Sequence, residues 1–317
     1  MLDLFQLFSE KNWSLEEQEK CLYTLSNHVE QHYRKVWIPK RNGKKRELFI
    51  PDSILLEVQR KILYDILLDI PVSNYARAYR KGYGLCQMAE AHKGKNMVMC
   101  LDIREFFGNI TYSMIYQQVF STKYYPLSVG TLLAHLCCYR DVLPQGAPTS
   151  PAISNLVLRP FDDYMGQWCE ERGIAYTRYC DDMVFSGEFN PRKVKNKVKG
   201  FLAVMGFSLN EEKSRISPSA KRQSVMGIIV NEKMQVRREY RRKVHQEVYY
   251  CHRYGVDGHL ARRAGGEKKN MKKERYLQSL LGKLNYILQI NPCDRQAKAD
   301  LIMVKDMIRT FSSAQEP

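Results

Sequence analysis

The chain has 317 residues, with 50 Lys and Arg against 34 Asp and Glu, which gives a formal net charge of +16. A hydrophobic share of 44% is enough for a folded core and excludes a wholly disordered basic protein. The length exceeds one typical domain of roughly 100–200 residues, so two or three packed subdomains are expected. The charge indicates a polyanionic partner, and nucleic acid is favoured over a membrane because no apolar run reaches about 18 residues.

The N-terminal quarter is expected to begin with a short helical lead-in over residues 1–30. Residues 36–51, VWIPKRNGKKRELFIP, predict two strands joined by a basic turn, because Asn-Gly favours tight hairpin turns. Apolar residues of the next segment, 53–70, recur at helical spacing, and Pro71 is expected to end that helix.

The middle of the chain alternates strand and helix signals. MVMCLDI, residues 97–103, is typical of a buried strand and delivers Asp102 to its tip. IAYTRYCDDMVFS, residues 174–186, predicts two strands around an Asp-Asp turn. The proline-rich loop at 143–151 is expected to open an amphipathic helix. The other expected elements are helices at 112–120, 127–139 and 191–204 and a strand pair near 207–216 and 224–236.

The composition changes beyond residue 236. The runs RREYRRK and RRAGGEKKNMKK concentrate positive charge, and the helical run YLQSLLGKLNYILQI follows them. We expect a boundary near 230–236, then a basic helical subdomain in which Gly265-Gly266 marks a flexible loop.

Three carboxylates are expected to converge if the two strand tips meet: Asp102, Asp181 and Asp182. Like charges a few ångströms apart repel strongly, and hard oxygen ligands favour Mg²⁺ as the compensating cation. Two such ions could activate an attacking hydroxyl and stabilise a leaving pyrophosphate. Taken alone, however, an Asp-Asp pair is also typical of a solvated hairpin turn.

Four further features favour a reactive site over a solvated turn. The rigid loop LPQGAPTSP allows close backbone approach to a nucleotide, and Phe107 follows Asp102 where a ring could press on a bound sugar. GFSLNEEK places Lys213 just past the hairpin. Cations suited to a triphosphate surround the first turn, namely Lys40, Lys44, Lys45 and Arg46.

In this order and spacing, MVMCLDIREFF, LPQGAPTSPAISNLVL, YTRYCDD and GFSLNEEKSRI resemble the palm of a reverse transcriptase over roughly residues 35–230. The resemblance implies an α+β right-hand polymerase that performs RNA-templated DNA synthesis with two Mg²⁺ ions and dNTPs. It also implies fingers over 31–95, a palm over 96–228 and a basic helical thumb over 229–317.

Carried over by position, the resemblance assigns roles to single residues. Metal would be bound by Asp102, Asp181, Asp182 and the backbone carbonyl of Ile103. Lys213 would be the candidate proton donor to pyrophosphate. The incoming nucleotide would meet a steric gate against the ribose 2′-OH, a palm contact and finger cations, namely Phe107, Gln145, Arg46 and Lys40.

The chain length, the form of the loop and SLLGKLNYILQINP are most similar to bacterial retron reverse transcriptases. That likeness implies a cytoplasmic enzyme that recognises one structured RNA, primes from an internal guanosine 2′-OH and leaves a branched RNA–DNA product. It also implies a partner effector in anti-phage defence. Two elements depart from the retron pattern: Met88 replaces the Asn of Asn-Ala-x-x-His, and Met226 replaces the Thr of Val-Thr-Gly.

The C-terminal basic runs are expected to contact RNA, because cations neutralise phosphates and tyrosines can stack on unpaired bases. The candidates are Arg237, Arg238, Arg241, Arg242, Tyr249, Arg262 and Arg263. His245, His252 and His259 recur every seven residues, which favours one helix face over a metal site. The nine cysteines contain no C-x-x-C pair and are expected to be reduced and mostly structural.

Two rival functions stay open at this point. The altered Asn and Thr positions suit a non-retron defence or abortive-infection reverse transcriptase, untemplated or protein-primed. A scaffold that holds RNA or restrains a partner would not need turnover, and its activity in cells would survive Asp181→Ala with Asp182→Ala.

Overall fold

The computed structural model describes residues 14–39, 43, 45–263 and 273–313. The chain divides into two compact units, one of Met1–Gly84 with Met99–Ile216 and the other of Leu85–Val98 with Ser217–Pro317. These units are defined by internal packing, and the proposed fingers, palm and thumb boundaries stay predictions. Lys40 and Lys44, two of the predicted triphosphate-binding cations, and the predicted Gly265-Gly266 loop lie outside the described residues.

The first unit opens with a helix and a hairpin. Helix α1 (Leu15–Asn27) begins at Ser14, whose side chain and that of Glu17 form a reciprocal capping box. A 3₁₀ turn, η2 (Val29–His32), leads into β1 (Tyr33–Pro39), which pairs antiparallel with β2 (Lys45–Pro51). The predicted hairpin is therefore confirmed.

The helix predicted over 53–70 is continuous but changes its geometry twice. An α-helical part, α2 (Ser53–Lys61), is capped by the Asp52 side chain and passes into a π turn, η3 (Ile62–Ile66), and a 3₁₀ turn, η4 (Leu67–Asp69). These turns keep Ile62, Ile66 and Leu67 buried while Leu68 stays 55% exposed. Regular helical spacing does not reveal such a change in winding.

A four-stranded sheet carries the centre of the chain, in the order β4-β5-β3-β6. Its strands are β3 (Met97–Asp102), β4 (Ala175–Tyr179), β5 (Asp182–Gly187) and β6 (Arg215–Pro218). Antiparallel pairing matches Tyr179 with Asp182, so Cys180 and Asp181 form the loop of the hairpin. The expected Asp-Asp turn is thus shifted by one residue, and Asp182 begins a strand.

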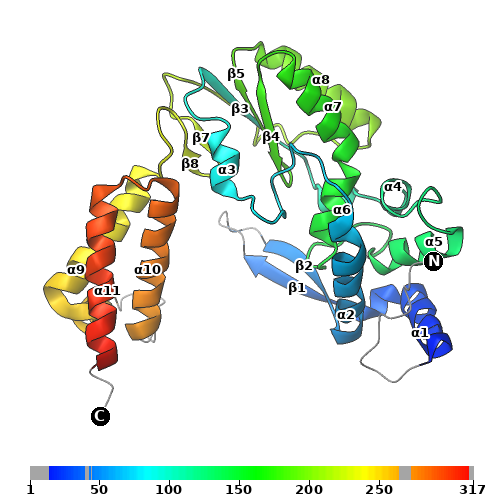
Figure 1. Cartoon of the computed structure of the whole chain (residues 1–317), viewed down its shortest axis with the longest axis horizontal. Helices are drawn as coiled ribbons and strands as arrows, with labels where there is room; N and C mark the ends of the chain where they lie inside the picture. The colour runs from blue at the N-terminus through cyan, green and yellow to red at the C-terminus, as the bar shows by residue number, and fades with distance from the viewer. Residues whose placement is uncertain (1–13, 40–42, 44, 264–272, 314–317) are drawn as a thin grey trace. The chain divides into compact units, whose positions relative to one another are not determined.

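Helices cover the sheet and supply most of the core. Helix α7 (Arg159–Glu170) packs against β4, and α8 (Pro191–Val204) packs against α7 (Figure 1). Buried Phe161 of α7 contacts Tyr176 of β4 edge to face, and Val198 of α8 is fully buried. The helices of this part are α4 (Tyr112–Gln118), α5 (Leu127–Leu136), α6 (Ser150–Val157), α7 (Arg159–Glu170) and α8 (Pro191–Val204), with the 3₁₀ turn η5 (Phe107–Asn109).

The strand pair predicted near 207–216 and 224–236 is wrong in extent. Residues 207–214 contribute one isolated bridge, between Leu209 and Ile103, before β6 begins. The second segment holds only β7 (Ser224–Val225) and β8 (Ile228–Ile229), joined by Met226 and Gly227, both at positive φ. Met226 and Gly227 therefore form a tight turn, although the apolar pattern predicted that they belong to a strand.

The second unit is mostly helical, with α3 (Leu85–Glu90), α9 (Arg238–Arg263), α10 (Lys273–Ile290) and α11 (Arg295–Ser313). Helices α9, α10 and α11 pack on one another (Figure 1), around buried residues such as Leu280 and Leu284. Gly255, at φ 71° and ψ 159°, interrupts α9. Among the described helices, none is both long and apolar enough to cross a membrane. All nine cysteines lie in the described part of the chain, and none of them forms a disulfide bond.

Candidate active site

Adjacent strands bring the three predicted carboxylates together at one end of the sheet. Asp102 is the last residue of β3, while Asp181 and Asp182 stand where β4 turns into β5, the neighbour of β3. The backbone ties these tips together, because the Ile103 N–H donates to the Asp181 carbonyl at 3.0 Å. The convergence expected from the sequence is therefore what the strand order produces.

Lys213 reaches the same place from the turn before β6. Its Nζ lies 2.7 Å from Oδ2 of Asp102, a residue only 3% exposed. Leu209 pairs with Ile103, and the Asn210 N–H donates to the Asp102 carbonyl at 2.8 Å, so this segment is pinned to the end of β3. Lys213 and Asp102, which lie 111 positions apart, thereby form an ion pair inside the site.

Burial and mutual repulsion make the ionised carboxylates costly. Burial raises the pKa of Asp102, and the nearby Asp181 charge adds to that, although Lys213 opposes both effects. The pKa of Asp182 is raised to about 6, chiefly by burial and then by the charges of Asp181 and Asp102. Lys213 therefore offsets only part of the negative charge of the three carboxylates, and a further cation at the site would be favourable.

The donor set suits a divalent cation. Oδ1 of Asp102 is buried and has no hydrogen-bond partner among the described residues, so one carboxylate oxygen is left for a ligand. Clustered carboxylate oxygens of this kind are the ligands that Mg²⁺ prefers. Within the described ranges, no group of three or more His, Cys, Asp or Glu side chains is placed so that it could hold a metal ion. The assignment of Asp102, Asp181, Asp182 and the Ile103 carbonyl as metal ligands therefore stays a prediction.

A buried arginine supports the turn of Cys180 and Asp181, here called the catalytic turn after its predicted role, and sequence reasoning missed this arginine. Arg178 of β4 is fully buried, and its Nε and Nη2 donate to both carboxylate oxygens of Asp162 in α7. Nη1 donates to the Cys180 carbonyl at 2.8 Å, and Nη2 also reaches Oδ1 of Asn155 at 3.3 Å. The Tyr176 hydroxyl completes the network on Asp162 at 2.8 Å. The only signal in the sequence was a charged residue inside the apolar strand IAYTRY.

The proline-rich loop is held against the hairpin of β1 and β2. The Gln145 carbonyl accepts the Phe49 N–H of β2 at 2.7 Å, and the Ser150 hydroxyl donates to the Pro144 carbonyl at 2.6 Å. Gly146 has φ 122°, and a Cβ there would lie 2.6 Å from the Phe49 carbonyl oxygen. A side chain is therefore excluded at Gly146, which fixes β2 and the loop at a close approach.

Phe107 and Arg46 are less tightly held than the carboxylates. Phe107 is half-buried in η5, its ring centroid 5.4 Å from that of buried Phe106. Arg46 lies on β2, three residues before Phe49, and is exposed. Gating by Phe107, nucleotide contact by Gln145 and triphosphate binding by Arg46 stay predictions.

The candidate RNA-contacting residues belong to α9 and the segment before it. Arg237, Arg238, Arg242 and Tyr249 are exposed, whereas Arg241 pairs with Asp294 at 3.1 Å. Arg262 is exposed and lies 4.1 Å from the centroid of the Tyr254 ring. The side chain of Arg263 lies outside the described part. This is a basic and partly aromatic helix surface, whose RNA binding stays a prediction.

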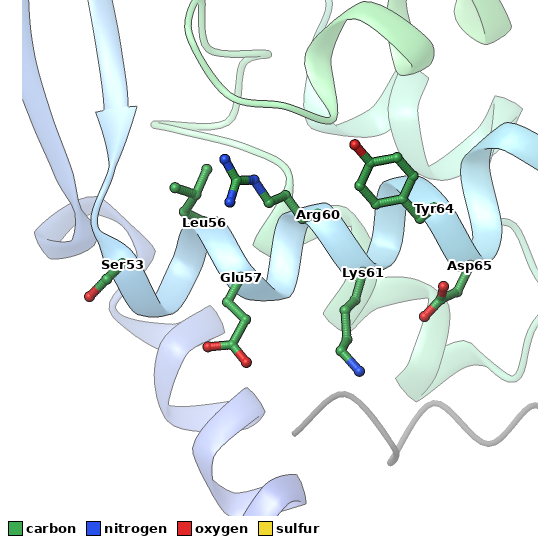
Figure 2. Close-up of a pocket in the computed structure, with 7 residues that line it drawn as sticks. All are labelled: Ser53, Leu56, Glu57, Arg60, Lys61, Tyr64 and Asp65. Carbon is green, nitrogen blue, oxygen red and sulfur yellow. The ribbon is translucent and has the colours of Figure 1, made fainter. Parts of the chain in front are cut away.

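A separate groove of about 440 Å³ runs along one face of α2 and η3 (Figure 2). It is lined at helical spacing by residues of both charge signs, namely Ser53, Leu56, Glu57, Arg60, Lys61, Tyr64 and Asp65. The opposing charges give it no clear preference for a polyanion. Among its described lining, no residue predicted to act in the site appears.

Comparison with known proteins matches residues 38–230 to the family "Reverse transcriptase (RNA-dependent DNA polymerase)". The chain is 30% identical over 258 residues to the Retron Mx65 reverse transcriptase of Myxococcus xanthus, a match that covers 73% of this chain and 60% of the relative. It is 27% identical over 242 residues to the Retron Ec86 reverse transcriptase of Escherichia coli, covering 75% and 74%. The match to the Retron Mx162 reverse transcriptase of Myxococcus xanthus, at 30% identity, covers 63% of this chain and 47% of that relative.

Among solved structures, the fold is similar to telomerase from Candida albicans at a TM-score of 0.45 and 10% identity, over 95% of this chain and 68% of that one. Likeness of this degree does not bear on function. The family match, in contrast, covers more than half of the chain. The protein therefore belongs to the reverse transcriptase family, which confirms the α+β right-hand polymerase and the resemblance seen in its sequence motifs.

Proposed function

We propose that the protein is an RNA-directed DNA polymerase of the retron type. One observation carries the proposal: three carboxylates meet at the tips of adjacent strands, with Lys213 bound to one of them. A solvated turn of Asp181 and Asp182 would not need beside it a buried Asp102 whose Oδ1 has no hydrogen-bond partner among the described residues. The similarity to retron reverse transcriptases adds the finer assignment.

In this proposal the carboxylates hold two Mg²⁺ ions. When bound, Mg²⁺ supplies the positive charge that lowers the pKa of an attacking hydroxyl and stabilises a leaving oxygen. Asp102 and Asp181 would hold these ions, and Asp182, with its raised pKa, must give up a proton before it can take part. Proton loss and cation binding are therefore coupled at Asp182.

Lys213 acts as the proton donor to pyrophosphate. Burial lowers its pKa, but the hydrogen bond to Asp102 and the charges of all three aspartates raise it by more. The ammonium is therefore protonated near neutral pH, as an acid must be before it acts. Its side chain is 60% exposed, so it can turn from Asp102 toward a leaving group.

The nucleotide is received by the loop and the hairpin together. Arg46, aided by Lys40, grips the triphosphate, Phe107 excludes a ribose 2′-OH, and Gln145 contacts the incoming dNTP. The Phe49–Gln145 hydrogen bond supports this arrangement, because it sets β2 and the loop side by side.

The partners proposed for this enzyme are a cognate structured RNA, its DNA product, dNTPs and an effector protein. The exposed arginines of α9 bind the RNA, of which one part is copied into branched single-stranded DNA. We place this activity in the cytoplasm and in anti-phage defence. Support comes from the retron relatives and from the surplus of 16 positive charges.

The first test measures dNTP incorporation on an RNA template with a DNA primer in Mg²⁺, for the wild type and for Asp181→Ala with Asp182→Ala. Incorporation that the double variant abolishes supports polymerase activity. No incorporation by a folded wild type contradicts it.

The second test purifies the protein from its native locus and examines the bound nucleic acid before and after RNase. A discrete small DNA that shortens with RNase and vanishes in the double variant supports the retron assignment. Heterogeneous DNA unaffected by RNase contradicts it and favours an untemplated or protein-primed enzyme. RNA alone in both samples favours a scaffold.

A further inference from the structure

The loop over residues 73–84, between η4 and α3, is joined to the catalytic hairpin by its backbone. Ala76 forms a parallel bridge with Arg178 of β4. The Arg77 N–H donates to the Arg178 carbonyl at 2.8 Å, and the Arg178 N–H donates to the Tyr75 carbonyl at 2.9 Å. Asn155 adds a side-chain hydrogen bond from Nδ2 to the Ala78 carbonyl at 2.9 Å. The loop is therefore held in a fixed register against β4, opposite Arg178, which lies two residues before Cys180.

Tyr79 fastens the tip of the loop to that turn. Its φ of 58° is unusual for a bulky residue, so surrounding contacts must hold it there. Its hydroxyl donates to Sγ of Cys180 at 3.4 Å. Burial raises the pKa of Tyr79, and the hydrogen bond to Cys180 and the charge of Asp181 raise it further. The loop thus lies beside the catalytic turn.

Two arginines of this loop lie against one aromatic ring, and neither has a counterion among the described residues. The guanidinium carbons of Arg77 and Arg80 lie 4.9 Å and 4.5 Å from the centroid of the Tyr83 ring. Within the described ranges, no carboxylate lies at ion-pair distance from either. Nε of Arg77 is buried without a hydrogen-bond partner there, whereas Nη1 of Arg80 donates to the Ser73 and Ala76 carbonyls. Exposed Lys81 follows them.

Stacking on one ring holds two like charges near each other, which is unfavourable until an anion joins them. A guanidinium presents a planar fork of N–H donors that matches the two free oxygens of a phosphodiester. Arg80 is already fixed by two carbonyls, so its remaining donors are oriented before any ligand arrives. This pair is therefore arranged to bind a phosphate.

We propose that Arg77 and Arg80 form a phosphate-binding site for the nucleic-acid strand on which the catalytic turn acts. The site rests on the proposed polymerase function and adds a contact to it. Because the loop is hydrogen-bonded to β4, a phosphodiester held there stands in a constant register with Asp181. The loop thereby positions the strand, and the carboxylates perform the chemistry.

The test measures the affinity for a fluorescently labelled RNA template annealed to a DNA primer, by anisotropy across a series of salt concentrations. Arg77→Gln should raise the Kd about tenfold, the effect of losing one hydrogen bond to a charged group. The slope of log K against log salt should fall by about 0.7–0.9 for each phosphate that the variant no longer neutralises. The KM for dNTP should stay unchanged.

Arg172→Gln is the matched control. Arg172 also lies over an aromatic ring, 4.5 Å from the centroid of Trp168, but it is exposed and is paired with Glu171 at 3.0 Å. This variant should leave affinity and salt slope unchanged. Arg77→Gln breaks no described side-chain hydrogen bond of Arg77, so the loop should stay folded. A second variant, Arg80→Lys, keeps the positive charge but removes the guanidinium.

Unchanged affinity and salt slope in Arg77→Gln would overturn the proposal, as would an equal loss in Arg172→Gln. A raised KM for dNTP with unchanged affinity would also overturn it, because the site would then bind the triphosphate. Arg80→Lys should keep the salt slope and lose affinity by less than Arg77→Gln. Binding is measured without turnover, so a wild type that binds but does not polymerise refutes the polymerase function and leaves this site standing.

Discussion

Replacing Asp162 by Asn should destabilise the first unit strongly, because it removes the only described counterion of a fully buried arginine. Asp162 and Arg178 are both 0% exposed, and Nη2 and Oδ2 are 2.5 Å apart. Burial lowers the pKa of Arg178, but Asp162 opposes that effect and the net change is upward, so the guanidinium stays charged in the core. Breaking a buried pair by removing one partner costs about 3–5 kcal/mol.

Urea unfolding followed by tryptophan fluorescence is the assay, since the described tryptophans Trp37 and Trp168 both lie in the first unit. The matched control is Asp163→Asn, which breaks an exposed i,i+4 pair with Arg159 on the same helix. That variant should cost less than about 1 kcal/mol. A loss of that small size in Asp162→Asn would refute the reasoning.

A double variant separates stability from positioning. Asp162→Leu with Arg178→Met removes both buried charges, and such replacements are often neutral or stabilising. The free energy of unfolding should therefore return toward the wild-type value. The kcat should be lower than that of the wild type, because the Cys180 carbonyl has lost the Arg178 donor at 2.8 Å. Recovery of both would show that Arg178 serves the core alone.

Three further predictions concern pH, packing and substrate choice. The pKa of Asp182 is about 6 in the folded protein, against an ordinary value of 3.8. Between these pH values the native state keeps a proton that the unfolded chain has lost. The free energy of unfolding should therefore fall as the pH rises from 3.8 to about 6. Asp182→Asn should flatten that part of the profile in urea titrations without metal, and an unaltered slope would contradict the shift. Gly146→Ala places a Cβ 2.6 Å from the Phe49 carbonyl oxygen and should cost about 1–3 kcal/mol while raising the KM for dNTP. Gly200→Ala in α8, with open space around its Cβ, should instead be neutral or stabilising by up to about 1 kcal/mol. Phe107→Ala should raise the ratio of kcat/KM for ribonucleotides over deoxyribonucleotides, and an unchanged ratio would remove Phe107 from the gate.

Asp102 and Asp182 could be predicted because one ends and the other begins an apolar strand, and Asp181 because it lies in the turn just before Asp182. Such patterns are visible in the sequence alone. The hairpin of β1 and β2 and the bounds of α8 were predictable for the same reason, since local turn and helix signals set them. Arg178 was not, because a charged residue in a strand indicates exposure, and its partner Asp162 lies 16 positions away on a helix. The winding change in η3 was hidden as well, because the same apolar residues satisfy an α or a π turn locally.

The loop over 73–84 has a consequence for the protein's behaviour in solution. β4 is the outermost strand of its sheet, and an uncovered outer strand offers N–H and C=O groups that another chain can pair with. Ala76 and its neighbours occupy part of that row. A chain in which this loop is displaced would therefore expose a strand edge. Self-association would then compete with folding at the hairpin that carries Asp181 and Asp182.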